Sequence, residues 1–150
     1  MLSTLGRCRG ITRKEIVLVL LIAAALTIYV SSLVRHRMND ALQDQASADL
    51  ERIASALHQY KLDNLRYPSP DQGLFALLES PALEPLPANW SGPYVNRASL
   101  LRDPWKRDYL YHSSDSPPSF SLSTLGADGE PGGTEANSDI VVKFHSDADY

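Results

Sequence analysis

The feature that most constrains this chain is an apolar run of nineteen residues, Ile16 to Val34, that contains no charged side chain. As an α-helix rising 1.5 Å per residue, such a run spans about 28 Å, close to the thickness of the hydrocarbon core of a bilayer. We therefore expect a single membrane-spanning helix. A cleaved secretory signal peptide is the alternative, because Ser31 and Ser32 place small residues near the end of the run.

The basic residues beside the run predict its orientation. Four precede it and two follow it closely: Arg7, Arg9, Arg13 and Lys14 before, Arg35 and Arg37 after. Segments rich in Lys and Arg stay on the cytoplasmic side of a membrane. The N-terminus is therefore expected in the cytoplasm and residues 35–150 outside it.

Composition limits what this exported part can be. It is long enough for one domain and too short for a large enzyme scaffold such as a TIM barrel. The net charge of −4 argues against a nucleic-acid binder, which would normally present a basic face. Cys8 is the sole cysteine, so no intramolecular disulfide and no Cys/His metal cluster can form.

A long helix is predicted to continue past the apolar run, because neither Gly nor Pro occurs from Ile11 to Tyr67. Its exported half carries one apolar stripe at helical spacing, formed by Leu42, Ala46, Leu50, Ile53, Leu57 and Tyr60. Acidic residues such as Asp49 are expected on other faces, and His58 is expected at the surface. Pro68 and Pro70 end the helical region.

The rest of the exported part predicts short elements around this helix. Asp71 is placed to cap a helix from Gln72 to Glu79, and Trp90 and Tyr94 are expected to hold the proline-rich loop that follows. Three strands are predicted at 109–112, 119–123 and 140–144, the first two joined by residues 113–118. Asp103-Pro104-Trp105 is interpreted as a structural turn. The expected fold is α+β, a long helix against a three-stranded antiparallel sheet.

The segment before the apolar run contains an unusual carboxylate, Glu15. A charge at the membrane boundary is costly to bury and often marks pairing or function. Cleavage after Gly10 would give Ile11 a free α-amine one helical turn from Glu15, and the two could neutralise each other between adjacent subunits. An ordinary polar boundary of a membrane anchor explains Glu15 equally well.

Gly10-Ile11 with Glu15 and the long apolar run resembles the prepilin signal of type IV pilins and pseudopilins. The resemblance implies that a prepilin peptidase cuts after Gly10 and methylates the Ile11 amine. It also implies a pilin-like fold, with a leader at 1–10, a membrane and assembly helix at 11–34 and a periplasmic domain at 35–150. Phenylalanine is usual in the family where Ile11 stands.

Six further segments narrow the resemblance. They are Tyr60-Lys61-Leu62-Asp63-Asn64, Arg66-Tyr67-Pro68, Gln72-Gly73-Leu74 with Ala76-Leu77, Gly92-Pro93-Tyr94, Asp103-Pro104-Trp105 and Leu125-Gly126-Ala127-Asp128-Gly129. In this order they are similar to the major pseudopilins of type II secretion systems, the general secretion pathway protein G family, from Gly10 to Ile140.

The last third of the chain is strongly acidic, with eight carboxylates from Asp108 to Tyr150 against Lys143 alone. Its glycine-rich loop, residues 125–139, has acids at both ends, and hard cations such as calcium bind carboxylate and carbonyl oxygens. A flexible acidic surface loop is the alternative. The family resemblance implies a calcium site, with Asp128 and Asp139 as carboxylate ligands, Leu125 and Glu130 as backbone ligands and Ser138 as a weaker candidate.

The resemblance implies a structural, non-enzymatic function: a subunit that polymerises into a pseudopilus after leader cleavage and drives folded proteins across the outer membrane. Its implied partners are other copies, minor pseudopilins, the prepilin peptidase and the inner-membrane assembly platform, with no nucleic acid. The implied location is the bacterial inner membrane, with a single span and a periplasmic domain. Alternatives are a single-span periplasmic binding module, a type IV pilus subunit, or a small membrane-bound hydrolase, for which no nucleophile motif is evident.

Overall fold

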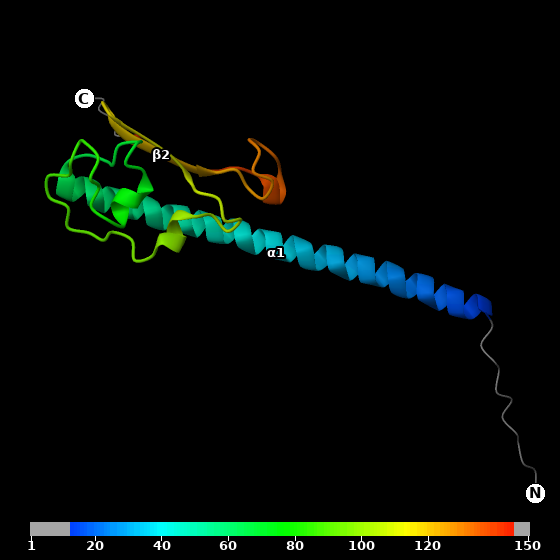
Figure 1. Cartoon of the computed structure of the whole chain (residues 1–150). Helices are drawn as coiled ribbons and strands as arrows, with labels where there is room; N and C mark the ends of the chain where they lie inside the picture. The colour runs from blue at the N-terminus through cyan, green and yellow to red at the C-terminus, as the bar shows by residue number, and fades with distance from the viewer. Residues whose placement is uncertain (1–12, 146–150) are drawn as a thin grey trace, which may run out of the picture. The chain divides into compact units, whose positions relative to one another are not determined.

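The computed structural model describes residues 13–145. Helix α1, Arg13–Asn64, is followed by the 3₁₀ helices η1, Leu74–Leu77, and η2, Ala98–Leu101. Strands β1, Leu110–Asp115, and β2, Pro118–Thr124, come next, and a further 3₁₀ turn, η3, Glu135–Asn137, precedes β3, Ile140–His145. The strands form one antiparallel sheet in the order β1-β2-β3. This is the predicted α+β class, and Figure 1 shows the sheet beside the C-terminal part of α1.

The chain divides into two compact units, one up to Met38 and the other from Asn39 onward. Within the first unit, every large apolar side chain from Ile16 to Val34 is between 49% and 72% exposed. By length and composition this part of α1 can cross a membrane. Its apolar surface therefore has no cover within the described residues of its own unit, and it needs lipid or other helices.

The second unit holds the hydrophobic core. The predicted stripe on α1 is confirmed, since Ala46, Leu50, Ile53, Leu57 and Tyr60 are all buried. Against it pack η1, η2 and the inward positions of the sheet, where Phe120 and Leu122 are buried. Burying a leucine or isoleucine side chain contributes about 1.5–3 kcal/mol, so this stripe is what holds the sheet to the helix.

The end of α1 has an unusual terminating residue. Leu65 adopts a left-handed conformation, φ 64°, and its amide donates to the Lys61 carbonyl at 2.8 Å. This is the single-bond cap that normally uses glycine after the last helical residue. The chain reverses at Leu65, whose own side chain stays 86% exposed.

The predicted helix from Gln72 to Glu79 is wrong in type and in cap. Only the four residues of η1 are helical, and no side chain caps it. Ser69 and Gln72 instead exchange hydrogen bonds, the Gln72 amide donating to Ser69 Oγ at 3.2 Å and the Ser69 amide to Gln72 Oε1 at 2.9 Å. Gly73, at φ 61°, then prevents this turn from continuing as an α-helix.

The first hairpin is tighter than predicted. Asp115 pairs with Pro118, so the connection is Ser116-Pro117 rather than residues 113–118. The middle of β1 is held to the segment after α1, because Tyr111 Oη and Ser113 Oγ both donate to the Pro68 carbonyl, at 2.8 and 2.6 Å. Tyr109, predicted as the first residue of the first strand, lies just before β1, while β2 and β3 contain all the residues predicted for them.

Two polar residues of α1 are more buried than predicted. Asp49 is only 6% exposed and accepts a hydrogen bond from Arg52 Nη1 at 2.9 Å. His58 is half-buried instead of lying at the surface, edge-on to Phe144 and Phe120 with ring centroids 4.6 and 5.4 Å away. Trp90 and Tyr94 confirm the prediction for the proline-rich loop, since Trp90 Nε1 donates to the Ala76 carbonyl at 2.9 Å and Tyr94 packs on Tyr60.

Candidate functional site

The loop between β2 and β3, residues 125–139, is closed at its base. The Ala127 amide donates to the Ala136 carbonyl at 2.8 Å, which brings the two ends of the loop together. Gly126, at φ 63°, permits this approach, because a Cβ there would lie 2.6 Å from the Asn137 carbonyl carbon. The loop is thus a folded turn anchored on the strands rather than an open tail.

The predicted ligand residues occupy separate positions in this loop. Asp128 and Glu130 are exposed and form a local turn, in which the Glu130 amide donates to Asp128 Oδ1 at 3.1 Å. Asp139 is half-buried, and its Oδ2 accepts from the Gly132 amide at 2.9 Å. Leu125 and Ser138 are half-buried at the two ends. No hydrogen bond within residues 13–145 joins Asp128 to Asp139.

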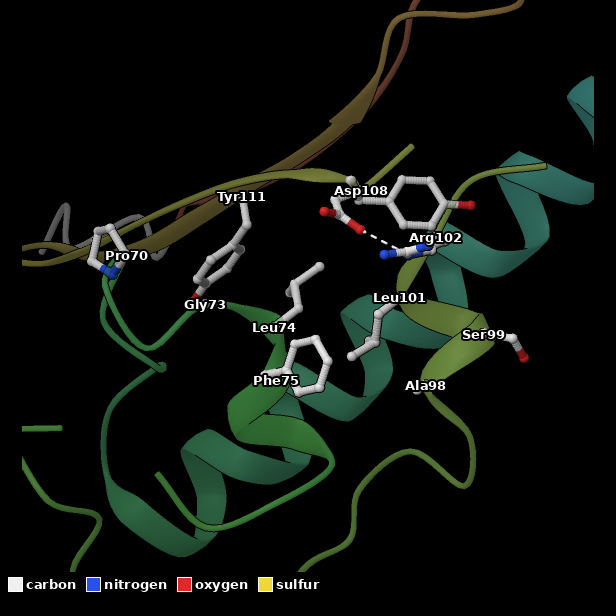
Figure 2. A pocket seen from close by; sticks show the side chains of 11 residues that line it. Pro70, Gly73, Leu74, Phe75, Ala98, Ser99, Leu101, Arg102, Asp108 and Tyr111 are labelled. Carbon is white, nitrogen blue, oxygen red and sulfur yellow. Dashed lines mark hydrogen bonds and ion pairs between the residues drawn. The ribbon is translucent and has the colours of Figure 1, made fainter. Parts of the chain in front are cut away.

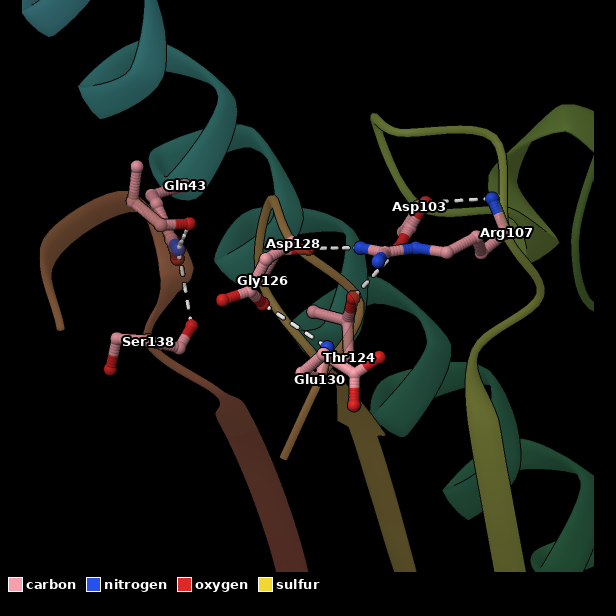
Figure 3. Close-up of polar contacts among 9 residues, drawn as sticks. Gln43, Asp103, Arg107, Thr124, Gly126, Asp128, Glu130 and Ser138 are labelled. Carbon is pink, nitrogen blue, oxygen red and sulfur yellow. Dashed lines mark hydrogen bonds and ion pairs between the residues drawn. The ribbon is translucent and has the colours of Figure 1, made fainter. Parts of the chain in front are cut away.

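One side of the loop is held by Arg107. Its Nη2 donates to the Gly126 carbonyl, and its Nε and Nη2 both donate to Asp103 Oδ2, at 3.1 and 3.0 Å (Figure 3). Asp103 also accepts from the Arg107 amide at 2.8 Å and from Thr124 Oγ1 at 2.7 Å. The predicted structural turn at Asp103 is therefore the attachment point of the loop, through a side-chain carboxylate that is only 1% exposed.

The other side of the loop is held by Gln43 of α1. Its Nε2 donates to the Ala136 and Ser138 carbonyls, at 2.7 and 3.1 Å, and more weakly to Glu135 at 3.4 Å (Figure 3). These are carbonyls of η3 and its C-terminal flank. Within the 3₁₀ turn only the Glu135 carbonyl has an amide donor, that of Ser138 at 3.1 Å, so the carbonyls of Ala136 and Ser138 depend on partners outside the turn. The helix and the loop are thus joined through one amide group.

One atom of the loop suits a cation. Asp139 Oδ1 is buried and accepts no hydrogen bond within the described residues. A buried carboxylate oxygen without a donor costs free energy that a bound cation would recover. Three or more acidic, His or Cys side chains do not converge on one point in residues 13–145, so any site here depends on backbone carbonyls in addition to the two aspartates.

A cavity of about 590 Å³ lies elsewhere, between η1, η2 and the start of β1 (Figure 2). Its lining is mainly apolar, and it includes Phe75, which is 62% exposed. At the rim, Arg102 Nε donates to Asp108 Oδ1 at 3.1 Å. Ser99 lines the cavity without a histidine beside it among the lining residues, so no nucleophile and base are paired there.

Comparisons with known proteins agree on one family. The family model for protein G of the type II secretion system matches residues 33–143. The type II secretion system core protein G of Pseudomonas aeruginosa is 39% identical over 132 residues, which cover 87% of this chain and 92% of that protein. Its counterpart in Vibrio cholerae is also 39% identical and covers 87% and 88% of the two chains. This chain belongs to the protein G family.

A solved structure supports the fold of this family member. The crystal structure of the major pseudopilin from the type 2 secretion system of enterohaemorrhagic Escherichia coli is 34% identical and matches with a TM-score of 0.56. The match covers 70% of this chain and 89% of that one. The predicted resemblance to the major pseudopilins is thereby confirmed.

The predicted processing and assembly residues of this protein G homologue lie at or beyond the start of the described chain. Gly10 and Ile11 are outside the described residues. Glu15 is in the first turn of α1 and is exposed. It is followed directly by the exposed apolar part of the helix, which begins at Ile16.

Sequence reasoning missed Gln43 and Arg107, the two side chains that hold the loop. Gln43 is one polar residue among several on α1, and nothing in its spacing distinguishes it. Arg107 offered a weak signal, because it is four residues from Asp103 across a turn and is the last basic residue before the acidic third of the chain. Their partners within the loop are backbone carbonyls, which no sequence pattern reveals.

Proposed function

We propose that this chain is a structural subunit of the type II secretion pseudopilus, polymerising after leader cleavage to drive folded proteins across the outer membrane. The observation that supports this most is the exposed apolar part of α1, a helix surface that can exchange lipid for the helices of neighbouring copies. Family membership and the relatives' name, type II secretion system core protein G, agree with it. No step of this function requires a substrate to be turned over.

The proposed assembly begins in the inner membrane, with the N-terminus in the cytoplasm and residues from 35 onward in the periplasm. A prepilin peptidase removes residues 1–10, and the new Ile11 amine pairs with Glu15 of a neighbouring copy. Pairing removes two charges that are costly in an apolar helix bundle, so subunits in the correct register are favoured. Minor pseudopilins and the inner-membrane assembly platform are the proposed further partners.

We also propose that the loop at 125–139 holds calcium. Asp139 is the best supported ligand because its Oδ1 is buried without a donor, and Asp128 would supply the second carboxylate. The Leu125 and Glu130 carbonyls would complete the oxygen set, with Ser138 as an additional candidate. A cation here neutralises acids in the part of the chain where they outnumber bases and stiffens a loop that Gln43 and Arg107 already fix on two sides.

The assembly proposal is tested by intact mass spectrometry of the chain isolated from membranes, together with a secretion assay in the same strain. The expected mass lacks residues 1–10 and carries one methyl group, and a strain without the peptidase keeps the leader and stops secretion. Glu15→Gln should be processed normally and fail to assemble. A chain that retains Met1 while secretion proceeds normally would contradict the proposal.

A further inference from the structure

The outward face of the sheet carries an uneven distribution of side chains. Each residue of β2 on this face is a serine, Ser119, Ser121 or Ser123. On the flanking strands the facing positions include larger, basic side chains: His112 of β1 and Lys143 of β3 are both in register with Ser121. Short side chains in the middle and tall ones on both sides leave a trough along β2.

This trough is present as a cavity of about 310 Å³, lined by the sheet residues 112–114, 119–121, Lys143 and His145. The outward positions of the three strands contain no carboxylate. Among residues 13–145, neither the serine hydroxyls of β2 nor the His112 and Lys143 side chains form a hydrogen bond or ion pair. Basic groups and hydroxyl donors therefore face solvent together, which suits a carboxylate.

This arrangement stands out because the surrounding sequence is acidic. Lys143 is the sole Lys or Arg after Arg107, and it lies on this face beside two of the four histidines, His112 and His145. The sequence that follows β3 directly, Ser146-Asp147-Ala148-Asp149-Tyr150, has two carboxylates and no base. The opposite charges of the trough and this segment are complementary.

The segment is long enough to reach the trough. With strands about 4.8 Å apart and a rise of about 3.3 Å per residue, Ser121 lies about 8 Å from His145 and His112 about 12 Å from it. The segment must first turn back over the face, because β3 runs from the Ser121 register to the Ser119 register and ends at His145. At no more than about 3.3–3.6 Å per residue, the residues after this turn place Asp149 over Lys143 and within side-chain reach of His112. Asp147 can reach no further than the near end of the trough.

We propose that the trough on the outward sheet face is a carboxylate-binding site that takes residues 147–149 of the same chain. Asp149 binds between His112 and Lys143, with Ser121 donating a hydroxyl hydrogen bond. Asp147 binds near His145 and Ser119. The docked segment covers the serines of β2 and neutralises the basic face of the sheet. This site is independent of the calcium loop and of the assembly helix.

Disulfide trapping in the full chain in detergent micelles tests the proposal. Cys8→Ser removes the native thiol, and Ala148→Cys with Ser121→Cys places two small side chains at the expected contact while keeping both aspartates. Mild oxidation should give a monomer that is lighter by two hydrogens. The matched control pairs Ala148→Cys with Ser99→Cys, an exposed residue of the cavity in Figure 2, and should close far more slowly.

The contribution of charge to docking is tested by further substitutions in the variant that carries Ala148→Cys and Ser121→Cys. Asp147→Asn with Asp149→Asn should slow closure about fivefold, the effect expected of two exposed ion pairs, and His112→Gln with Lys143→Gln should do the same. Disulfide formation that is no faster than in the Ser99 control would overturn the proposal. So would a rate that neither the Asp147→Asn and Asp149→Asn pair nor the His112→Gln and Lys143→Gln pair lowers. Disulfide-linked dimers as the main product would also overturn it, because they would place the segment on a second copy.

Discussion

The Arg107 guanidinium donates to the carboxylate of Asp103 through Nε and Nη2, at 3.1 and 3.0 Å, and to the backbone carbonyl of Gly126. One side chain thus joins a buried acid to the start of the loop at 125–139. Asp103 needs this partner because its side chain is only 1% exposed. A buried carboxylate that loses a charged donor keeps its desolvation cost.

We expect Arg107→Gln to lower the free energy of unfolding by about 2 kcal/mol, the usual cost of losing hydrogen bonds to a charged group. The cost stays below that of an isolated buried charge because Thr124 and the Arg107 amide still donate to Asp103. Thermal unfolding of the full chain in detergent measures the change.

Arg102→Gln is the matched control, because its ion pair with Asp108 joins side chains that are 63% and 80% exposed. Exposed pairs contribute about 0–1 kcal/mol, so this variant should unfold close to the wild type. Equal effects of the two substitutions would show that the Asp103 contact does not fix the loop.

His58 predicts a pH dependence of stability. Burial, followed by the nearby Lys61 charge, lowers the pKa of His58 below its ordinary value of 6.5. The neutral ring can accept a hydrogen bond from Tyr67 Oη, 3.1 Å from Nδ1. The unfolded chain therefore binds a proton at a higher pH than the folded chain, and this contribution is fully present above pH 6.5 and lost as the pH falls through the folded pKa.

The measurement is the unfolding midpoint of the wild type and of His58→Gln between pH 8 and pH 5.5. Glutamine keeps an acceptor for Tyr67 and does not titrate. The wild type should lose stability relative to the variant as the pH falls, and subtracting the two curves removes the contributions of the other histidines. A constant difference over this range would contradict the prediction.

The left-handed conformation of Leu65 leads us to predict a stabilising substitution at this position. A left-handed residue with a side chain costs about 1–2 kcal/mol, and glycine avoids this cost at the end of a helix. Glycine also makes the unfolded chain more flexible, so we expect Leu65→Gly to stabilise the protein by about 0.5–1 kcal/mol. Lys106, at φ 71° in the turn after Asp103, should respond in the same direction.

Leu62→Gly provides the opposite control. Leu62 is also exposed, at 72%, but lies inside α1. Glycine in a helix interior costs about 1 kcal/mol, so the same replacement three residues earlier should destabilise the chain. Denaturant unfolding of both variants would refute the argument if their effects had the same sign.

The parts of the fold that were predictable from sequence are those with a local period. The helical spacing of Leu50, Ile53 and Leu57 and the alternation of β2 are repeated signals, and both elements lie where the sequence placed them. The short helix after Pro70 was not predictable, because Ser69 and Gln72 form a reciprocal pair that satisfies the turn without Asp71. A single glycine conformation at Gly73 then decides its length.

The loop at 125–139 likewise has residues whose role could be predicted from sequence and residues whose role could not. Acids at both ends of a glycine-rich segment suggested Asp128 and Asp139, since charge and composition are visible in sequence. The contacts of Gln43 and Arg107 were not visible, because each depends on a backbone carbonyl brought close by the tertiary fold. His58 was mistaken for a surface residue because its aromatic neighbours, Phe120 and Phe144, are more than sixty positions away along the chain.

The proposed calcium site makes the last prediction. At a calcium concentration 100 times the dissociation constant, binding would add about 2.7 kcal/mol to the free energy of unfolding. Chelation of the full chain should therefore lower the unfolding temperature, and Asp139→Ala and Asp128→Ala should each abolish the response. Asp139→Ala also removes Oδ1, which is buried and accepts no hydrogen bond within the described residues. Without calcium, this substitution should therefore lower the free energy of unfolding by less than the loss of a buried, fully hydrogen-bonded carboxylate would.

Asp115→Ala is the control for charge, because Asp115 is an exposed acid at the end of β1, outside the loop. It should keep the full calcium response. Differential scanning calorimetry with calcium and with a chelator compares the three variants. If calcium were held only by the general acidity of this region, each of the three substitutions would reduce the calcium-dependent rise in unfolding temperature equally. Equal reductions would therefore exclude a site built around Asp139. Loss of the calcium effect in Asp128→Ala and Asp139→Ala but not in Asp115→Ala requires a site in the loop.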